Sequence, residues 1–455
     1  MTGPVDRSVA PQTAAAHPYA FPDVAQGRLD NGMAVRTLSK VELPLVTALV
    51  FLEAGESTAP TESPGIAVLC GDALEGGTKA RPGHELAEAL EGMGASFGTA
   101  TGWDSTTVAI SCLADRLSDA MPLLSEMIRR PSFDQTEFDR FRSQRLASIR
   151  QRQMDPGSLA GDGFARFLYG DSAAYGRPLG GTEEAVKGFT PKDARAFWED
   201  RYLPDGGGLV MVGDLDLAEA QALADEHFGG WAGTPSSNGP SPTAPSVESA
   251  PVQAVHVIHR PGSVQTQIRV GHLGVARSTP DYFPLQVLNL ALGGSFTSRL
   301  NLNLREKHGY TYGVRSRLVA RRSPGPFFVS TAVETKVTKA AVTEIHSEIR
   351  QMAESGPTED EVESARSYLA RVFPLKLETT GQVASRVAEM LVYGLESDYY
   401  KNYRDRVRKV SVSQTTDAAT RHLRPSELLT VLVGDADAIA SEFDTGAFGP
   451  VTVHE

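Results

Sequence analysis

The sequence is poor in cysteine and has no long apolar run. Among 455 residues there are two cysteines, Cys70 and Cys112. Two thiols cannot form the disulfide network that stabilises small secreted domains, so a reducing compartment is favoured. No apolar stretch approaches the roughly 20 residues of a membrane-spanning helix. The N-terminal segment also lacks the basic start and apolar core of a signal peptide. We therefore expect a cytoplasmic protein with no membrane partner.

Positive charge is also in deficit. The chain has 44 Lys and Arg against 56 Asp and Glu, a formal net charge of -12. Nucleic acids and anionic membranes are bound by basic surfaces, so neither is expected as the main partner. Hydrophobic residues make up 41% of the chain, an ordinary globular proportion. The length predicts two or three domains, each large enough for its own core.

A linker rich in Pro, Ser and Gly divides the chain almost in half. It covers residues 233–252, and such a composition cannot build a core. We expect a flexible N-terminal arm over residues 1–22. The first domain is then predicted over residues 23–232 and the second over residues 253–446.

The two halves end on similar segments. Arg201–Leu203 and Arg421–Leu423 each close a helix-like stretch, and each is followed by an apolar strand that ends on Val-Gly-Asp. Gly213–Asp214 and Gly434–Asp435 lie at corresponding positions. A repeat of about half the chain indicates a duplicated domain, since the units of solenoid proteins are roughly 20–50 residues long.

Strand-like and helix-like patterns occur in both halves. Residues 106–113 and 327–334 alternate apolar and polar side chains, as half-buried strands do. Residues 84–93 and 337–352 place their apolar side chains on one helical stripe, and Thr358–Glu361 reads as a capping box at a helix start. These patterns come in clusters without strict alternation. We predict an α+β fold in which each domain is an antiparallel sheet with helices on one face.

The most specific stretch of the chain, "LGGSFTSRLNLNLREKHGYTYGV", begins at Leu292. Gly293 and Gly294 are predicted to open a helix that carries Ser298 and Arg299, and Gly309 is predicted to end it.

Arg305 lies near the end of that predicted helix and Tyr312 follows seven residues later. A strand is predicted after Gly309, with Tyr310 and Tyr312 on the same face. The turn at Gly309 would bring the heads of Arg305 and Tyr312 together. A guanidinium and a phenol can both donate hydrogen bonds to a peptide carbonyl. The alternative is a solvated helix end followed by an ordinary strand.

This stretch resembles the second-half signature of the insulinase, pitrilysin and mitochondrial-processing-peptidase family, the inverted zincins. The resemblance extends over about residues 25–445. It implies that Arg305 and Tyr312 bind the substrate backbone and help to hold the developing oxyanion. It also points to Gly293, Gly294, Ser298 and Arg299 as substrate-binding positions.

The family's zinc motif, H-x-x-E-H, is degenerate in this chain. In the matching segment "GIAVLCGDALEGGT", Val68 and Asp72 stand at the two histidine positions and Gly71 stands at the glutamate position. Where the family has a third ligand on a later helix, this chain has Ala147 and Ser148. In the family the histidines hold zinc and the glutamate acts as general base. We therefore expect no metal and no cofactor in this chain.

Other candidate sites have ordinary explanations. Asp72 and Glu75 lie one helical turn apart, which is typical of a solvated acidic face. His256 and His259 are predicted on opposite faces of a strand and so would not chelate a metal. The basic run "VRSRLVARR", residues 314–322, reads as a solvated strand edge or as a contact for an acidic peptide.

Some enzymes of the resembled family are split into a zinc-bearing subunit and a zinc-free subunit that keeps the Arg/Tyr pair. Each subunit is half of a clamshell. The resemblance implies that this chain is the zinc-free half and is inactive alone. Its expected partners are a homologous subunit with an intact H-x-x-E-H motif and its zinc, and a peptide substrate, such as a leader peptide. Two alternatives remain: a structural subunit of a larger assembly, and a stand-alone peptide-binding module.

Overall fold

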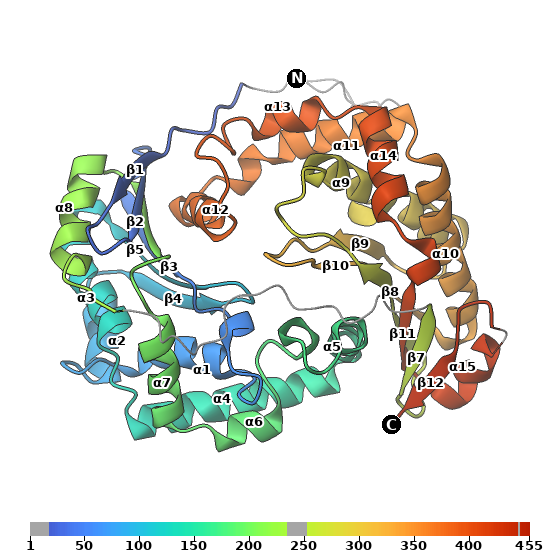
Figure 1. The fold of residues 1–455 in the computed structure, drawn as a ribbon, viewed down its shortest axis with the longest axis horizontal. Helices are drawn as coiled ribbons and strands as arrows, with labels where there is room; N and C mark the ends of the chain where they lie inside the picture. Colours follow the sequence, from blue (N-terminus) through green and yellow to red (C-terminus); the bar gives the residue numbers. More distant parts are fainter. Residues whose placement is uncertain (1–17, 234–252, 445) are drawn as a thin grey trace, which may run out of the picture.

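The protein contains two six-stranded sheets, each with its own layer of helices (Figure 1). The computed structural model describes residues 18–233, 253–444 and 446–455. The predicted linker lies outside the described residues except for Gly233. Within the described part of the chain, no helix combines the length and apolar character needed to cross a bilayer.

The first sheet has the strand order β1-β2-β6-β3-β5-β4. Neighbouring strands are antiparallel except β2 and β6, which run parallel. The strands are β1 (Ala25–Arg28), β2 (Ala34–Ser39), β3 (Leu45–Leu52), β4 (Ser96–Thr101), β5 (Thr106–Leu113) and β6 (Gly208–Gly213).

The second sheet repeats this plan with the order β12-β7-β11-β8-β10-β9. Its parallel pairs are β7 with β11 and β7 with β12. The strands are β7 (Ala254–His259), β8 (Gln265–Leu273), β9 (Val314–Leu318), β10 (Pro326–Glu334), β11 (Leu429–Gly434) and β12 (Val451–His454). The predicted end of the second domain at residue 446 therefore leaves out one strand of its sheet.

The two-domain α+β architecture is confirmed, but the sheets are mixed and not purely antiparallel. In each half the strand that carries Val-Gly, β6 or β11, inserts between two earlier strands and runs parallel to one of them. It reaches that place after a long helical connection, and parallel pairing requires such a crossover.

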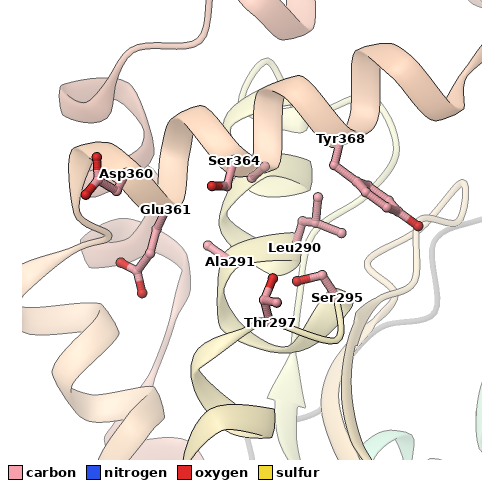
Figure 2. A pocket seen from close by; sticks show the side chains of 9 residues that line it. Leu290, Ala291, Ser295, Thr297, Asp360, Glu361, Ser364 and Tyr368 are labelled. Carbon is pink, nitrogen blue, oxygen red and sulfur yellow. The ribbon is translucent and has the colours of Figure 1, made fainter. Parts of the chain in front are cut away.

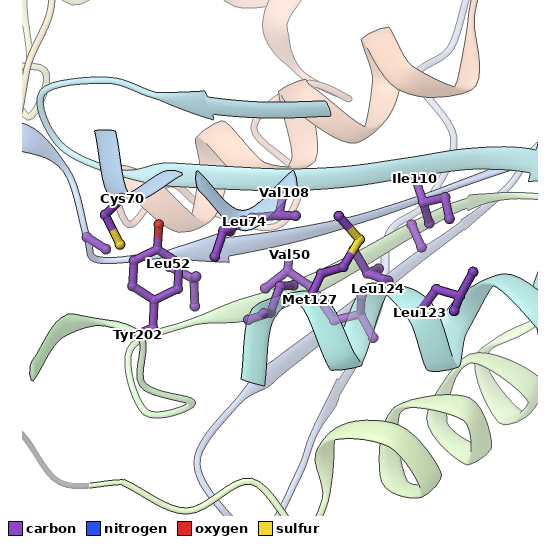
Figure 3. Packing of buried hydrophobic residues seen from close by; sticks show 14 of the residues in the cluster. Val50, Leu52, Cys70, Leu74, Val108, Ile110, Leu123, Leu124, Met127 and Tyr202 are labelled. Carbon is purple, nitrogen blue, oxygen red and sulfur yellow. The ribbon is translucent and has the colours of Figure 1, made fainter. Parts of the chain in front are cut away.

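Helices cover the outer face of each sheet (Figure 1). In the first half the outer core includes Val50, Leu124 and Met127, which Figure 3 shows between a helix and the sheet. The helices of this half are α1 (Ile66–Ala73), α2 (Gly83–Gly92), α3 (Leu117–Arg129), α4 (Gln135–Met154), α5 (Pro156–Tyr169), α6 (Glu183–Gly188), α7 (Pro191–Arg201) and α8 (Leu217–Phe228).

The second half has a matching helical layer, whose core includes Ile268, Val329 and Ile345. Its helices are α9 (Tyr282–Asn289), α10 (Thr338–Ser355), α11 (Glu359–Val372), α12 (Thr380–Val392), α13 (Tyr403–Arg408), α14 (Val412–His422) and α15 (Ala436–Phe443).

The two halves exchange helices across their inner faces. Helix α5 of the first half packs on β8 and β11 of the second sheet, and α12 of the second half packs on β3 and β6 of the first sheet. The expectation of helices on one face only is therefore incomplete. The reason lies in the strands themselves, because every residue of β6 and β11 is buried and both faces of the strand need a cover.

The end of the predicted N-terminal arm is packed against the second half. Phe21 is buried, and its ring lies 5.6 Å from that of Tyr400. Tyr19 meets Phe373 edge to face at 6.2 Å. These contacts hold residues 18–22 in place. Residues 1–17 lie outside the described residues.

Candidate functional site

The glycine pair closes one helix and does not open the next. Helix α9 continues as a π-helical turn, Leu290–Gly294, in which Gly293 is the fourth residue. A Cβ atom on Gly293 would lie 2.7 Å from the Ser316 nitrogen of β9. The pair therefore permits a close approach of helix and strand. The next helical segment starts at Arg299, is π-helical over Asn301–Lys307, and ends at Gly309, where φ is +64° as predicted for a helix stop.

Ser298 and Arg299 face the protein. Ser298 is buried, and its hydroxyl donates to the Ser295 carbonyl at 2.6 Å. Arg299 forms a two-pronged ion pair with Glu361 and donates to the Gly356 carbonyl at 3.0 Å. The hydrogen bonds that Arg299 donates to the Glu361 carboxylate raise the pKa of Arg299. Both residues thus support the helix that carries Arg305, and their predicted contact with substrate stays a prediction.

A small pocket lies beside this helix start. Figure 2 shows Ser295 and Thr297 facing Ser364 and Tyr368 of α11 across it. Its volume is about 270 Å³ and its lining is mixed polar and apolar.

Arg305 is held by two neighbours but keeps donors free. Its guanidinium carbon lies 4.2 Å from the centre of the Phe296 ring, a cation–π distance. Its Nε is 3.3 Å from Glu306 Oε1. The side chain remains 35% exposed. The N–H groups of a guanidinium point outward in its own plane, so a guanidinium that lies over a ring can still donate to a ligand at its edge.

Tyr312 is almost fully exposed, at 96%. The strand predicted to hold it begins later, at Val314, so residues 309–313 form a loop and the alternation predicted for Tyr310 and Tyr312 is wrong. The loop is tied by the Thr311 hydroxyl, which donates to the Gly313 carbonyl. Tyr310 instead stacks on His308, with ring centres 4.9 Å apart. The phenol of Tyr312 is therefore presented to solvent.

Arg305 and Tyr312 line one cleft. The cleft has a volume of about 780 Å³. It is lined by the loop over residues 308–312 and by Lys336 and Val337, which directly precede α10. Ala332, Val333 and Glu334 of β10 also line it. The structure thus brings together the two residues that the sequence predicts to act together. Both residues line a space large enough for a short extended peptide.

The degenerate zinc segment forms α1, against the first sheet. Val68 is buried, and Gly71 lies so close to β4 that a Cβ atom would sit 2.5 Å from Thr101 Oγ1. A glutamate at position 71 would therefore require Thr101 to move. At the position of the family's glutamate, the helix thus packs closely against the strand and carries no side chain.

An ion pair occupies the position of the second ligand. Asp72 accepts a hydrogen bond from Arg145 of α4, one turn before Ser148. Ser148 is half-buried on the same helix. A valine, a glycine, a carboxylate already paired with arginine, and a serine do not fit a zinc ion, which needs three or four N, S or O ligands.

In the part of the chain that the structure describes, the one group of three potential metal ligands lies elsewhere. It consists of His259, Asp435 and Asp437, at the start of α15. Asp435 caps that helix, and His259 Nδ1 accepts from the Ala436 nitrogen at 3.0 Å. His256 contacts His454 instead, at 2.9 Å, so the two histidines of "HVIH" have different neighbours.

A buried carboxylate holds the start of α1, and the sequence analysis missed it. Glu56 is 1% exposed and accepts hydrogen bonds from the nitrogens of Gly65 and Ala67. Burial raises the pKa of Glu56 to about 8, although these donors and Arg177 act in the opposite direction. The signal in the sequence was weak, because an acidic residue ten positions before the first residue of a helix is common on surfaces.

We expect the stability of the protein to carry a pH dependence from Glu56. Its folded-state pKa of about 8 exceeds the ordinary value of 4.5, so the folded state binds the extra proton between these values. Stability from this group is therefore present at low pH and is lost as the pH rises toward 8, at up to about 1.4 kcal/mol per pH unit. Denaturant midpoints of the wild type and Glu56→Gln at pH 5, 6, 7 and 8 should diverge, with Gln gaining. A difference in midpoint between the two proteins that stays constant from pH 5 to pH 8 would contradict this pH dependence.

Two family models match this chain. The model described as insulinase, peptidase family M16, matches residues 35–165, and the model described as peptidase M16 inactive domain matches residues 188–369. The first match contains the degenerate segment and the second contains Arg305 and Tyr312.

Relatives and solved structures agree with these matches. An uncharacterised zinc protease of Streptomyces coelicolor is 27% identical over 317 residues, 69% of this chain and 68% of that one. A non-peptidase homologue of Helicobacter pylori, YmxG, is 21% identical and covers 86% of this chain and 90% of its own. The crystal structure of a peptidase M16 inactive domain from Pseudomonas fluorescens superposes with a TM-score of 0.84 at 25% identity, covering 91% of this chain and 98% of that one.

The fold and the two matched segments define a two-domain chain of the inverted-zincin type. This chain belongs to the insulinase family, peptidase family M16.

Proposed function

We propose that this chain is the zinc-free subunit of a two-subunit zinc peptidase that processes peptides. A homologous partner with an intact H-x-x-E-H motif supplies the zinc and the general base. This chain supplies Arg305 and Tyr312 across the shared chamber. The observation that carries the proposal is the contrast between the two halves: Arg305 and Tyr312 line one cleft, while Asp72 is engaged by Arg145.

The chemistry assigned to this chain is hydrogen bonding to a carbonyl. The phenol O–H of Tyr312 and the guanidinium N–H groups of Arg305 would donate to the carbonyl oxygen of the scissile peptide. Negative charge grows on that oxygen only as the bond is attacked, so the same donors hold the transition state more tightly than the substrate. Phe296 under the Arg305 guanidinium limits its rotamers, which keeps the donors in place before substrate arrives.

A second candidate function is peptide binding without catalysis. The printed name of the Helicobacter pylori relative, a non-peptidase homologue, favours it. In that case the cleft beside Arg305 and Tyr312 would capture peptides, and a partner would not accelerate any cleavage. Turnover by the reconstituted pair separates the two functions, whereas peptide affinity alone does not.

The purified chain should hold no stoichiometric zinc and should cleave no peptide. The reason is the set of residues at the metal positions, since Val68, Gly71 and Ser148 offer no strong ligand. Elemental analysis of the chain after dialysis against zinc tests this, with a family member that keeps H-x-x-E-H as the positive control. One tightly held zinc per chain, with cleavage that a chelator stops, would contradict the proposal.

Assembly can be tested separately from chemistry. We expect the chain and its zinc-bearing homologue, co-expressed at micromolar concentration, to elute as a one-to-one complex whose zinc content equals that of the partner. Leader peptides are the first substrates to assay, because a closed chamber favours unfolded segments. Two species that elute separately would count against a shared active site.

A further inference from the structure

The basic run "VRSRLVARR" is divided by the structure into two pairs of arginines with different surroundings. The first pair, Arg315 and Arg317, lies on β9, and the second pair, Arg321 and Arg322, lies in the turn before β10. Together they put four guanidinium groups into eight residues of a chain whose net charge is -12. The contacts of each arginine show which of the four stabilise the fold.

Arg321 and Arg322 join the two halves of the molecule. Arg322 forms an ion pair with Glu53 at 2.6 Å, and its backbone nitrogen donates to Asp104 Oδ2 at 3.0 Å. Arg321 lies over the rings of Trp103 and Tyr175, at 5.1 and 4.5 Å. Arg322 Nε also donates to the Val392 carbonyl of the second half at 2.9 Å. Both arginines thus hold the first half to the second, and their role is structural.

Arg315 and Arg317 have no such partners. Both are exposed, and among the described residues neither makes an ion pair or a side-chain hydrogen bond. Alternation along β9 puts them on one face of the sheet, because the alternate residues Val314 and Ser316 are buried on the other face. Strand β9 is also the edge of its sheet, so its outer N–H and C=O groups are not paired within the sheet.

A third arginine adds to the positive charge of this face. Arg269 of β8 pairs with Ser330 of β10, which in turn pairs with Arg315, so the three residues lie in one row across the sheet. Arg269 donates to two backbone carbonyls and, among the residues that the structure describes, forms no ion pair with a carboxylate. Burial and the charge of Arg317 lower its pKa, and the nearby carboxylate of Asp155 acts in the opposite direction.

The arginine face adjoins the cleft that Arg305 and Tyr312 line. Ala332 lines that cleft, and it lies on the same face of β10 as Ser330 and Phe328, which pair with Arg315 and Arg317. At 3.2–3.4 Å per residue, Arg315 is about 7 Å and Arg317 about 13 Å along the strand direction from Ala332. A peptide that extends from the cleft along β9 would meet both arginines within about four residues.

We propose that Arg315 and Arg317, with Arg269 behind them, recognise an acidic stretch of the peptide substrate, two to four residues from the bond that lies in the cleft. The proposal rests on the proposed function for the position of that bond, but the recognition itself needs only this chain. A strand alongside β9 places every second side chain on the arginine face, so Asp or Glu residues spaced i and i+2 fit best. Guanidinium forks bind carboxylates in a planar, two-pronged geometry.

Peptide binding to this chain alone tests the proposal. The probes are fluorescein-labelled 12-residue extended peptides with Glu at i and i+2, the same peptide with Gln at those positions, and the same with Lys. Fluorescence anisotropy at about 50 mM salt should show the Glu peptide binding about tenfold more tightly than the Gln peptide. The Lys peptide should bind more weakly than both. Raising the salt to about 300 mM should shrink the difference, as screening predicts.

The double variant Arg315→Ala and Arg317→Ala should lose most of the preference for Glu and should leave affinity for the Gln peptide unchanged. Arg116→Ala with Arg408→Ala is the matched control, because both side chains are about half exposed and lie far along the chain from the cleft. A Glu preference that survives in the Arg315/Arg317 variant, or that is absent from the wild type, overturns the proposal. A single-stranded 12-mer of DNA that competes at these arginines while the Glu peptide does not would also overturn it.

The outcome is separable from that of the proposed function. A Glu preference without turnover by the reconstituted pair would refute catalysis and leave recognition standing. Turnover without any effect of Arg315 and Arg317 on peptide choice would refute recognition alone.

Discussion

Replacing Tyr312 by Phe should lower the turnover number of the reconstituted pair by about 100-fold or more, because loss of one oxyanion donor typically costs 100- to 1,000-fold. The substitution removes one hydroxyl and keeps the ring. Since Tyr312 is 96% exposed, its hydroxyl makes no contact that the fold depends on. Folding, assembly with the partner and zinc content should therefore stay at wild-type values.

Arg305→Ala should act in the same range, and Arg305→Lys should not restore activity, because an ammonium group lacks the planar fork. Tyr368→Phe is the control for the phenol: it is half exposed on α11, outside the cleft. Steady-state rates with a saturating peptide measure the effect on kcat, and size-exclusion of each variant with the partner measures assembly. Wild-type turnover in properly assembled Tyr312→Phe and Arg305→Ala pairs would show that these residues play no part in the chemistry.

Phe164→Ala should destabilise the protein by about 3–5 kcal/mol, the usual cost of removing a buried aromatic side chain. Phe164 is 3% exposed on α5, and its ring lies 5.8 Å from Phe328 of the second sheet. Helix α5 belongs to the first half and covers the sheet of the second. Loss of the Phe164 ring should therefore also weaken the packing of the two halves against each other. Denaturant unfolding followed by near-ultraviolet circular dichroism measures the first effect.

Amide hydrogen exchange measures the second. In Phe164→Ala we expect faster exchange in β8 and β11, on which α5 packs, while β3 and β5 of the first sheet stay protected. Leu375→Ala is the control, because that side chain is 61% exposed and should change stability by less than about 0.5 kcal/mol. A midpoint for Phe164→Ala equal to that of the control would mean that the exchanged helix contributes little.

Local patterns in the sequence predicted many elements closely. The alternation over residues 106–113 coincides with β5, and the capping box at Thr358 and Glu361 is present at the start of α11. The helical stripe over residues 337–352 lies within one residue of the start of α10. These signals depend on neighbours along the chain. The packing of α5 and α12 on the sheet of the other half depends on contacts far along the chain. A helix pattern shows that one face is apolar, but it does not show which sheet that face contacts.

The candidate site could be predicted only where it depends on residues close together in the sequence. Spacing placed Arg305 and Tyr312 near one turn, and Gly309 marked the helix end. Spacing could not show that Gly293 lies against Ser316 of β9. It therefore did not predict that the glycine pair ends a helix, where it had been expected to open one. Nor could it show that Arg145, 73 residues after Asp72, would pair with it. Contacts between elements far apart in sequence decide these features.

The central claim is that this chain completes an active site whose metal lies in a partner, and a titration tests it most directly. A fixed amount of the zinc-bearing homologue is mixed with increasing amounts of this chain, and peptide cleavage is measured with zinc content determined on the separated subunits. Cleavage should rise to a plateau at one equivalent, zinc should remain with the partner, and Tyr312→Phe should assemble with the same stoichiometry but give a plateau about 100-fold lower. Cleavage by the partner that is independent of this chain, or zinc-dependent cleavage by this chain alone, would contradict the claim.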